Sequence, residues 1–216
     1  MLTALLVATL AFQEPPAWER FGPGSWVEHR TTGTRDGQPM KEVVKTSLKG
    51  VTDLEINLLI QTTDAKGGWV GGEVKYPLPQ RAGPKEEWTK TGQEDLSVDG
   101  KTFACEIRER HGVRRWFSPG AKANGGVLRS ESISGTVKVL SRVLKLEEKV
   151  RVGTATVTCW VREEVTDTGD QKITRTHWIS DEVPGGLVRL EVRQTRGKDR
   201  IEETDTVLTS FEVVKK

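Results

Sequence analysis

Two stretches of the chain, residues 98–131 and 152–191, carry the same reactive residue types in the same order. Each runs Gly, Cys, Glu, Trp, Ser, Gly-Gly, Arg and Glu, with identical spacing from Cys to Glu and from Gly-Gly onward. Cys and Ser are nucleophiles, and paired carboxylates can act as general acid and base. The equivalent positions are Gly100/Gly153, Cys105/Cys159, Glu109/Glu163, Trp116/Trp178, Ser118/Ser180, Gly125-Gly126/Gly185-Gly186, Arg129/Arg189 and Glu131/Glu191.

The duplicated carboxylates, Glu109 and Glu163, are the strongest candidates for chemistry. In each copy the Glu continues an inward-pointing row of alternate residues, and an Arg follows later in the same copy. Either each Glu forms a cross-strand ion pair with the Arg of its copy, Arg129 or Arg189, or the carboxylates form the paired site of a hydrolase. Because an active site seldom needs two equal copies in one small chain, the duplication favours the ion pair.

Cys105 and Cys159 are the two cysteines of the chain and occupy equivalent positions. In an exported protein they could form a disulfide if the copies pack symmetrically, which would stabilise the fold by about 4 kcal/mol. The alternative is two small buried thiols, each filling a core position in its own strand. The sequence leaves both alternatives open.

Other motifs with chemical meaning predict no site. Asp167-Thr168-Gly169 matches the tripeptide of aspartic proteases, but it occurs once and lies among charged residues typical of a hairpin turn. His29, His111 and His177 are dispersed and lack the spacing of metal ligands. The glycine-rich run 67–72 lacks the Lys-Ser/Thr of a phosphate loop and is interpreted as a bulged or flexible strand. We therefore expect no cofactor, no metal and no catalytic residue among these motifs.

The remaining repeated residues are interpreted as structural. Trp116 and Trp178 are expected to pack near the Gly-Gly turn of their own copy. Glycine at 125–126 and at 185–186 suits a turn with positive φ, which larger residues adopt only at a cost.

Alternation of apolar and polar residues, typical of half-buried antiparallel strands, dominates the chain. Cys105, for example, shares one strand face with Phe103 and Ile107. Short strands, turns rich in Gly and Asp, and a single possible short helix at 84–91 predict an all-β protein. The expected architecture is an antiparallel curved sheet or open barrel built from two or three related units. Strands are expected over 25–32, 41–48, 54–62, 102–109, 136–146, 174–180, 187–195 and 202–214.

Five segments are predicted along the chain. An apolar stretch of about 11 residues opens the sequence, which is too short for a membrane span of roughly 20 residues and is typical of a secretory signal. The segments are a signal peptide at 1–13, an N-terminal β unit at 18–76, a connecting segment at 77–95, repeat copy 1 at 96–147 and repeat copy 2 at 148–214. The N-terminal unit resembles a worn third copy without the Cys.

Composition limits the classes of partner. The chain has 216 residues, of which 35% are apolar and 30% charged, and its net charge is +2 with acids and bases interleaved. This pattern offers no basic patch for nucleic acid and no polybasic arm for lipid headgroups. We expect no transmembrane segment in the mature chain, and a secreted or periplasmic location.

The repeat also carries a resemblance. Its Gly…Cys…Glu…Trp-x-Ser…Pro-Gly-Gly-x-Val-Arg pattern, matched most closely by Trp178 to Arg189, resembles exported bacterial proteins of uncharacterised function with a short signal peptide. The strand-turn-strand order is similar to the curved sheet of periplasmic lipoprotein carriers, the LolA-like half-barrel. That likeness implies a concave apolar face able to hold a lipid chain.

Three functions follow as hypotheses. The first is an exported, non-enzymatic binding or structural module whose partner is an envelope protein or a polymer. The second is a carrier of a lipid or another apolar ligand within a concave sheet. The third is a carboxylate-dependent hydrolase, which the duplication disfavours.

Overall fold

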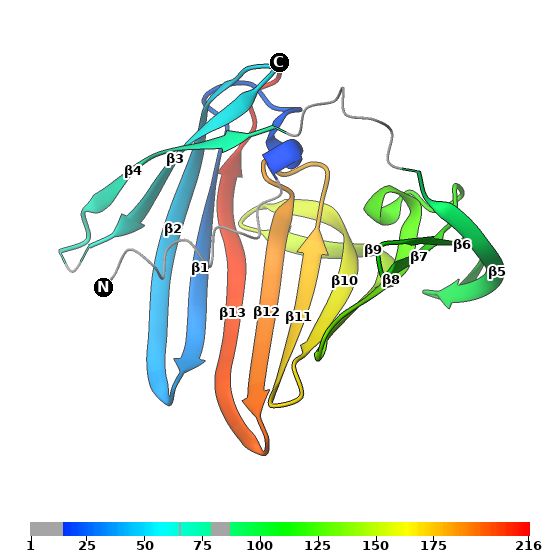
Figure 1. Cartoon of the computed structure of the whole chain (residues 1–216). Helices are drawn as coiled ribbons and strands as arrows, with labels where there is room; N and C mark the ends of the chain where they lie inside the picture. Colours follow the sequence, from blue (N-terminus) through cyan, green and yellow to red (C-terminus); the bar gives the residue numbers. More distant parts are fainter. Residues whose placement is uncertain (1–14, 65, 79–86) are drawn as a thin grey trace.

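A single antiparallel sheet contains all the named strands of the protein (Figure 1). The computed structural model describes residues 15–64, 66–78 and 87–216, so the expected signal peptide at 1–13 lies outside the described residues. The strands are β1 (Trp26–Arg35), β2 (Gln38–Val51), β3 (Glu55–Thr63), β4 (Trp69–Pro77), β5 (Thr89–Val98), β6 (Lys101–Arg110), β7 (Val113–Phe117), β8 (Val127–Ser134), β9 (Val137–Val152), β10 (Ala155–Asp167), β11 (Gln171–Ile179), β12 (Leu187–Arg196) and β13 (Asp199–Glu212).

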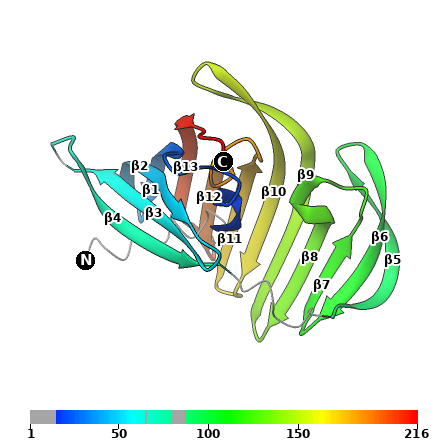
Figure 2. The ribbon, with the colours of Figure 1, turned by 90° about the horizontal axis from the view of Figure 1, so that it is seen from above.

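The sheet consists of two runs of strands, β1–β4 and β5–β13, and within each run consecutive strands are neighbours. Strand order is β4-β3-β2-β1-β13-β12-β11-β10-β9-β8-β7-β6-β5. The first run leads outward from β1 to the edge strand β4, and the second enters at the opposite edge with β5 and returns to pair β13 with β1. Figure 2 shows the sheet curving strongly without closing on itself. The prediction of an all-β protein with a curved antiparallel sheet is confirmed.

Tight two-residue turns set the strand register. Asp36 and Gly37 have φ of 49° and 74°, and His111 and Gly112 have 45° and 75°. Two successive positive φ values define the turn whose twist matches that of adjacent strands, and they favour Asp, Asn and Gly. Both turns contain Gly, in keeping with the turns rich in Gly and Asp that the sequence predicts between strands.

Helical structure is sparse. Within the described ranges it consists of two short 3-10 turns, η1 (Pro15–Trp18) and η2 (Ala123–Gly126). The described residues contain no helix that is long and apolar enough to cross a membrane.

Of the 11 described residues of the connecting segment predicted at 77–95, eight lie in strands. β4 continues to Pro77, and β5 begins at Thr89, within the range 84–91 where a short helix is expected. The helix is therefore wrong for residues 89–91, and 79–86 lie outside the described residues. Edge strands such as β5 show little burial, so they lack the alternation that reveals central strands.

Two apolar clusters form the core, one at each end of the sheet. The copy 1 cluster draws its side chains from β5 to β9 and from the connection between β7 and β8. The copy 2 cluster draws on η1, β1 to β3 and β9 to β13. The copy 1 cluster consists of Val98, Cys105, Trp116, Ala121, Ala123, Leu128 and Val143, and the copy 2 cluster consists of Trp18, Phe21, Val27, Val44, Leu48, Ile56, Leu58, Ile60, Val152, Val157, Cys159, Val161, Trp178, Val183, Val188 and Leu208.

The tip of one long hairpin closes over each cluster. At the tip of β5–β6, the Asp99 Oδ2 accepts a hydrogen bond of 3.3 Å from the Leu146 backbone of β9, four strands further on. At the tip of β9–β10, a Cβ placed on Gly153 would lie 3.9 Å from the Thr209 carbonyl oxygen of β13, again four strands further on. The hairpins β5–β6 and β9–β10 therefore each reach the fourth strand further along the sheet.

Candidate functional site

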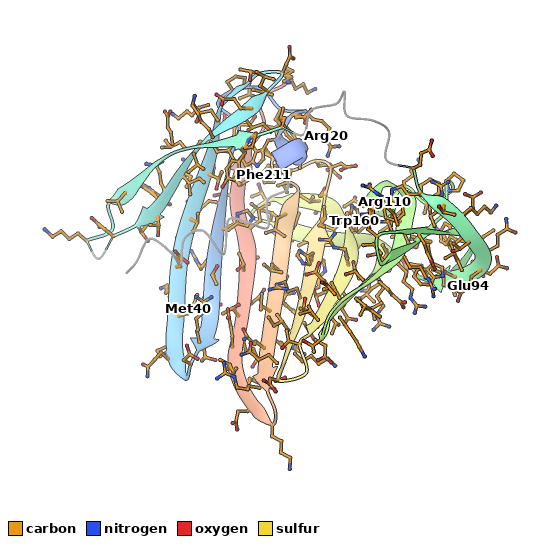
Figure 3. The ribbon with its side chains drawn as sticks, in the orientation of Figure 1. Arg20, Met40, Glu94, Arg110, Trp160 and Phe211 are labelled. Atoms are coloured by element: carbon orange, nitrogen blue, oxygen red, sulfur yellow. The ribbon has the colours of Figure 1, made fainter. Side chains whose placement is uncertain are left out.

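In each repeat the tryptophan donates a partly buried hydrogen bond to a residue that the sequence motif does not include. Trp116 Nε1 donates a hydrogen bond of 2.6 Å to Glu94 Oε2, and Trp178 Nε1 donates one of 3.1 Å to Glu148 Oε1. Each Glu lies directly opposite the repeated Cys on the neighbouring strand. Figure 3 shows Glu94 on β5, at the outer edge of the sheet.

Sequence reasoning missed Glu94 and Glu148, although a signal for them exists. Each precedes the Cys of its copy by the same interval of 11 residues, Cys105 and Cys159 respectively. The repeat therefore begins one strand earlier than the motif suggests. The pKa of Glu148 is lowered, first by a hydrogen bond from Lys145 and then by that from Trp178.

The repeated arginines stack on these tryptophans. The Arg129 guanidinium lies 4.5 Å from the Trp116 ring centroid, and that of Arg189 lies 4.9 Å from the Trp178 centroid. Each Arg also forms an ion pair with the Glu two residues along its strand. A Glu–Trp–Arg–Glu layer of this kind stabilises neighbouring strands through cation–π and charge-assisted contacts.

Arg189 carries an additional contact that copy 1 lacks. Its Nε and Nη2 donate to the two carboxylate oxygens of Asp205 on β13, at 3.0 and 2.9 Å. This hydrogen-bonded pair raises the pKa of Arg189.

The predicted ion pair between the repeated Glu and Arg is wrong in its partners. Glu163 accepts a hydrogen bond of 2.9 Å from Arg142 on β9, and Glu109 accepts one of 2.5 Å from Arg114 on β7. The reason is strand order, because β11 separates Glu163 on β10 from Arg189 on β12. Adjacent strands lie about 4.8 Å apart, and across this double spacing the register aligns Glu163 with Glu191 rather than with Arg189.

Cys105 and Cys159 are free and buried, as in the second of the two alternatives from the sequence. Three strands separate β6 from β10, which places the thiols well beyond disulfide reach. Burial raises the pKa of Cys159 to about 12 and also raises that of Cys105. Thiols of this kind are poor nucleophiles at neutral pH because the thiolate is the reactive form.

The Gly-Gly turns have the positive φ values that the sequence predicts. φ is 59° and 87° at Gly125 and Gly126, and 74° and 76° at Gly185 and Gly186. In both copies the amide of the repeated Ser donates a 2.8 Å hydrogen bond to the carbonyl of the second glycine. The repeated Ser and Gly therefore shape the connection between the tryptophan strand and the arginine strand.

Two of the three histidines are buried and held neutral. Burial lowers the pKa of His177 to about 3, with smaller contributions from Arg162 and Arg175. The pKa of His29 is lowered by burial too, and its Nε2 donates to the Leu187 carbonyl at 2.9 Å. No group of three or more potential metal-binding side chains occurs within residues 15–64, 66–78 and 87–216.

A polar hollow lies over β12, β13 and β1. Its volume is about 370 Å³, and Arg189 borders it through its pairs with Glu191 and Asp205. Because the guanidinium occupies both carboxylates, they act as hydrogen-bond acceptors rather than as an acid and a base. The lining residues are Thr32, Gly33, Thr34, Glu191, Val192, Arg193, Glu203, Thr204 and Asp205.

The two edges of the sheet differ in their exposed chemistry. β4 pairs with β3 in an unbroken register over nine residues and exposes Trp69, Val70 and Val74. The run 67–72 is expected to be a bulged or flexible strand; the structure places its residues 69–72 in β4 without a register shift and residues 67–68 in the turn before it. β5 is charged, and its pairing with β6 shifts register between Lys90 and Gly92. Charge and irregularity protect an edge from further pairing, whereas a regular, apolar edge accepts another strand.

Comparisons with known proteins add a weak likeness of fold. No protein-family model matches the chain, and no curated protein matches it significantly. A candidate lipoprotein from Parabacteroides distasonis ATCC 8503 has a TM-score of 0.46 and 14% identity, over 88% of this chain and 96% of that chain. A candidate exported protein with a YmcC-like fold from Bacteroides fragilis NCTC 9343 has a TM-score of 0.40 and 14% identity, over 89% of this chain and 98% of that chain. At these TM-scores the likeness supports no functional argument.

Proposed function

We propose that the protein is an exported, non-enzymatic module that binds an extended polypeptide segment along the edge strand β4. The observation that carries this proposal is the β4 edge itself. Its side chains include Trp69 with 41% and Val70 with 48% exposure, and β3 is its single partner in the sheet order. An added strand gains main-chain hydrogen bonds along the edge and side-chain contacts on both faces.

Export is part of the proposal because of the N-terminal sequence. The short apolar stretch before residue 13 has the length of a signal peptide rather than of a membrane span. An edge of this kind is an aggregation hazard in a crowded compartment unless a dedicated partner covers it.

Binding is favoured over catalysis because, among the described residues, the thiol, histidine and repeated carboxylates considered for chemistry are engaged or suppressed. Burial raises the thiol pKa of Cys159 and lowers the pKa of His177, so neither suits nucleophilic or acid–base work near neutral pH. The repeated carboxylates Glu109 and Glu163 are each bound by an arginine.

A polypeptide partner is also favoured over an apolar ligand. A carrier needs an apolar hollow, but seven of the nine residues that line the described hollow over β12, β13 and β1 are Thr, Glu, Asp or Arg, and the other two are Gly33 and Val192. Within each of the two clusters, the apolar side chains instead pack against one another. The exposed apolar residues of β4 lie on an edge, where they suit a strand.

In-cell photo-crosslinking tests the proposal. A photoreactive residue replaces Val70 in the cells that produce the protein, and a matched variant carries it at Thr91 on β5. We expect a defined polypeptide product from position 70 that is absent from position 91. Glu73→Pro should abolish the product, because proline removes an outward N–H of the edge. A product that forms equally from both positions, or that survives Glu73→Pro, contradicts the proposal.

A further inference from the structure

The hydrogen bonds at the two ends of β4 define which of its backbone groups face outward. The Asp64 amide donates to the Gly68 carbonyl at 2.8 Å, and the Leu78 amide donates to the Leu54 carbonyl at 2.7 Å. Both pairs belong to the same unbroken β3–β4 register. In an antiparallel ladder, alternate residues bond to the same neighbour. Even-numbered residues of β4 therefore bond to β3, and the N–H and C=O groups of Trp69, Gly71, Glu73 and Lys75 point away from the sheet.

We propose that the segment bound at this edge is β4 of a second copy of the chain, antiparallel and related by a two-fold axis through Gly72. This inference rests on the proposed function of β4 as a strand-binding edge. The outward-facing residues are odd-numbered, so a two-fold axis through Gly72 pairs Gly71 with Glu73 and Trp69 with Lys75. The backbone N–H and C=O groups of all four residues then form hydrogen bonds with the other copy.

The side chains complement one another in this register. Trp69 lies opposite Lys75 of the second copy, Val70 lies opposite Val74, and Gly71 leaves room opposite Glu73. The chain already uses an aromatic–cation contact between neighbouring strands, although across a diagonal pair, since Lys45 Nζ of β2 lies 4.1 Å from the Trp26 centroid of β1. Cross-strand apolar and aromatic pairs of this kind stabilise a sheet.

Neighbouring registers lose this complementarity. An axis through Glu73 places two carboxylates directly opposite each other, which is destabilising. An axis through Gly71 places Val70 opposite Gly72 and Trp69 opposite Glu73, so the apolar pair is lost. A slip of a single residue exchanges the two faces of the strand.

The second copy is favoured over an unrelated polypeptide because β4 complements itself. The opposite edge cannot extend the assembly in the same way, since β5 is irregular and Glu94 is engaged by Trp116. A two-fold contact through β4 alone therefore closes at a dimer. One strand pair is a small interface, so we expect weak association.

A single cysteine at the axis tests the inference. Across a two-fold axis Gly72 forms a pair without hydrogen bonds, with Cα atoms about 4.5 Å apart, which is within disulfide range. A Cβ at Gly72 meets nothing within 4 Å, and the native cysteines are buried and unreactive. We expect Gly72→Cys to give a covalent dimer under mild oxidation at protein concentrations from about 1 µM to about 1 mM, which brackets weak interfaces. The matched Thr91→Cys on β5 should stay monomeric.

Three outcomes overturn the inference. They are a Gly72→Cys variant that stays monomeric, a Thr91→Cys variant that cross-links as readily, and a Glu73→Cys variant that cross-links faster than Gly72→Cys. A charge swap checks the register without a disulfide: Val70→Lys with Val74→Lys should abolish dimers in analytical ultracentrifugation. Val70→Lys with Val74→Glu should restore them, and failure to restore them contradicts the register.

The photo-crosslinking experiment distinguishes failure of this inference from failure of the proposed function. If the photo-crosslink at position 70 joins β4 to a different polypeptide, the module still binds a strand and the self-pairing is wrong. If no product depends on β4, both fail.

Discussion

The two repeat copies share one hydrogen-bonded frame but fill the space beside their Gly-Gly turns differently. In copy 1 the second glycine, Gly126, follows Ser118 by eight residues, and the longer connection buries its own Ala121 and Ala123. In copy 2 Gly186 follows Ser180 by six residues. There the space is filled by Trp18 of η1, whose side chain is fully buried.

This difference shows that the same local motif can be stabilised either by residues close to it in the sequence or by residues far from it. Copy 1 is completed by residues close in sequence. Copy 2 is completed by Trp18, which lies more than 160 residues from the Gly185–Gly186 turn it contacts. Copy 2 therefore depends on a contact that forms only when both ends of the chain are folded together, and such contacts carry a larger loop-closure cost.

Truncation of the distant tryptophan should have the largest effect. Trp18→Ala removes a fully buried indole, so we expect a loss of about 3–5 kcal/mol in the free energy of unfolding. Urea denaturation measures the loss, and Trp69→Ala, an exposed position, is the control expected to change it by less than about 0.5 kcal/mol. Hydrogen exchange should then show β10–β12 losing protection while β6–β8 retain it. Equal loss in both copies contradicts the comparison.

Acid should weaken copy 2 through a residue that copy 1 lacks. His177 precedes Trp178 and is buried, whereas the equivalent residue before Trp116 is the exposed Arg115. The folded pKa of His177 is lowered to about 3, so the unfolded chain binds the proton first. The folded state keeps its full stability, as far as His177 is concerned, above pH 6.5, the ordinary pKa of histidine. As the pH falls towards about 3, the free energy of unfolding decreases by up to about 1.4 kcal/mol per pH unit.

Urea midpoints measured from pH 7.5 to pH 4 check this slope, over a range set by the histidine pKa values above. His177→Gln should remove the part of the slope due to His177 and leave the part due to His29, whose pKa is also lowered, and to carboxylates. A wild-type protein and a His177→Gln variant with the same slope would show that the histidine is accessible to protons in the folded state.

The smallest expected difference concerns the two turns themselves. A Cβ at Gly185 would lie 2.8 Å from Trp18 Nε1, whereas one at Gly125 meets nothing within 4 Å. Both residues have positive φ, so Gly125→Ala should cost about 1–2 kcal/mol through backbone strain alone. Gly185→Ala should cost about 1–3 kcal/mol more, because overpacking adds to the strain.

A double-mutant cycle isolates the added cost of overpacking. In the Trp18→Ala background the two glycine substitutions should become equivalent, as measured by thermal unfolding. If they remain unequal, the tryptophan is not the cause of the difference.

Much of the fold was predictable because central strands bury one face. β12 and β13 appear as alternation, and the turns at Asp36-Gly37 and His111-Gly112 carry the residues their φ values require. The edge strand β5 was missed, and β4 was expected only as a bulged or flexible strand over 67–72, because a strand with little burial needs no apolar face. The partners of Glu163 and Arg189 were missed because they depend on which strand lies between them.

By itself the sequence determined the strand periodicity, the turn glycines and the equivalence of the two repeat copies, because these follow from local backbone preferences and from the side-chain period of two. Tertiary structure alone decided that the cysteines stay apart, that Trp18 completes copy 2 and that β4 ends the sheet with a regular, exposed edge. Strand order and hairpin coiling determine which of these residues lie close together, and both arise from contacts between residues far apart in the chain.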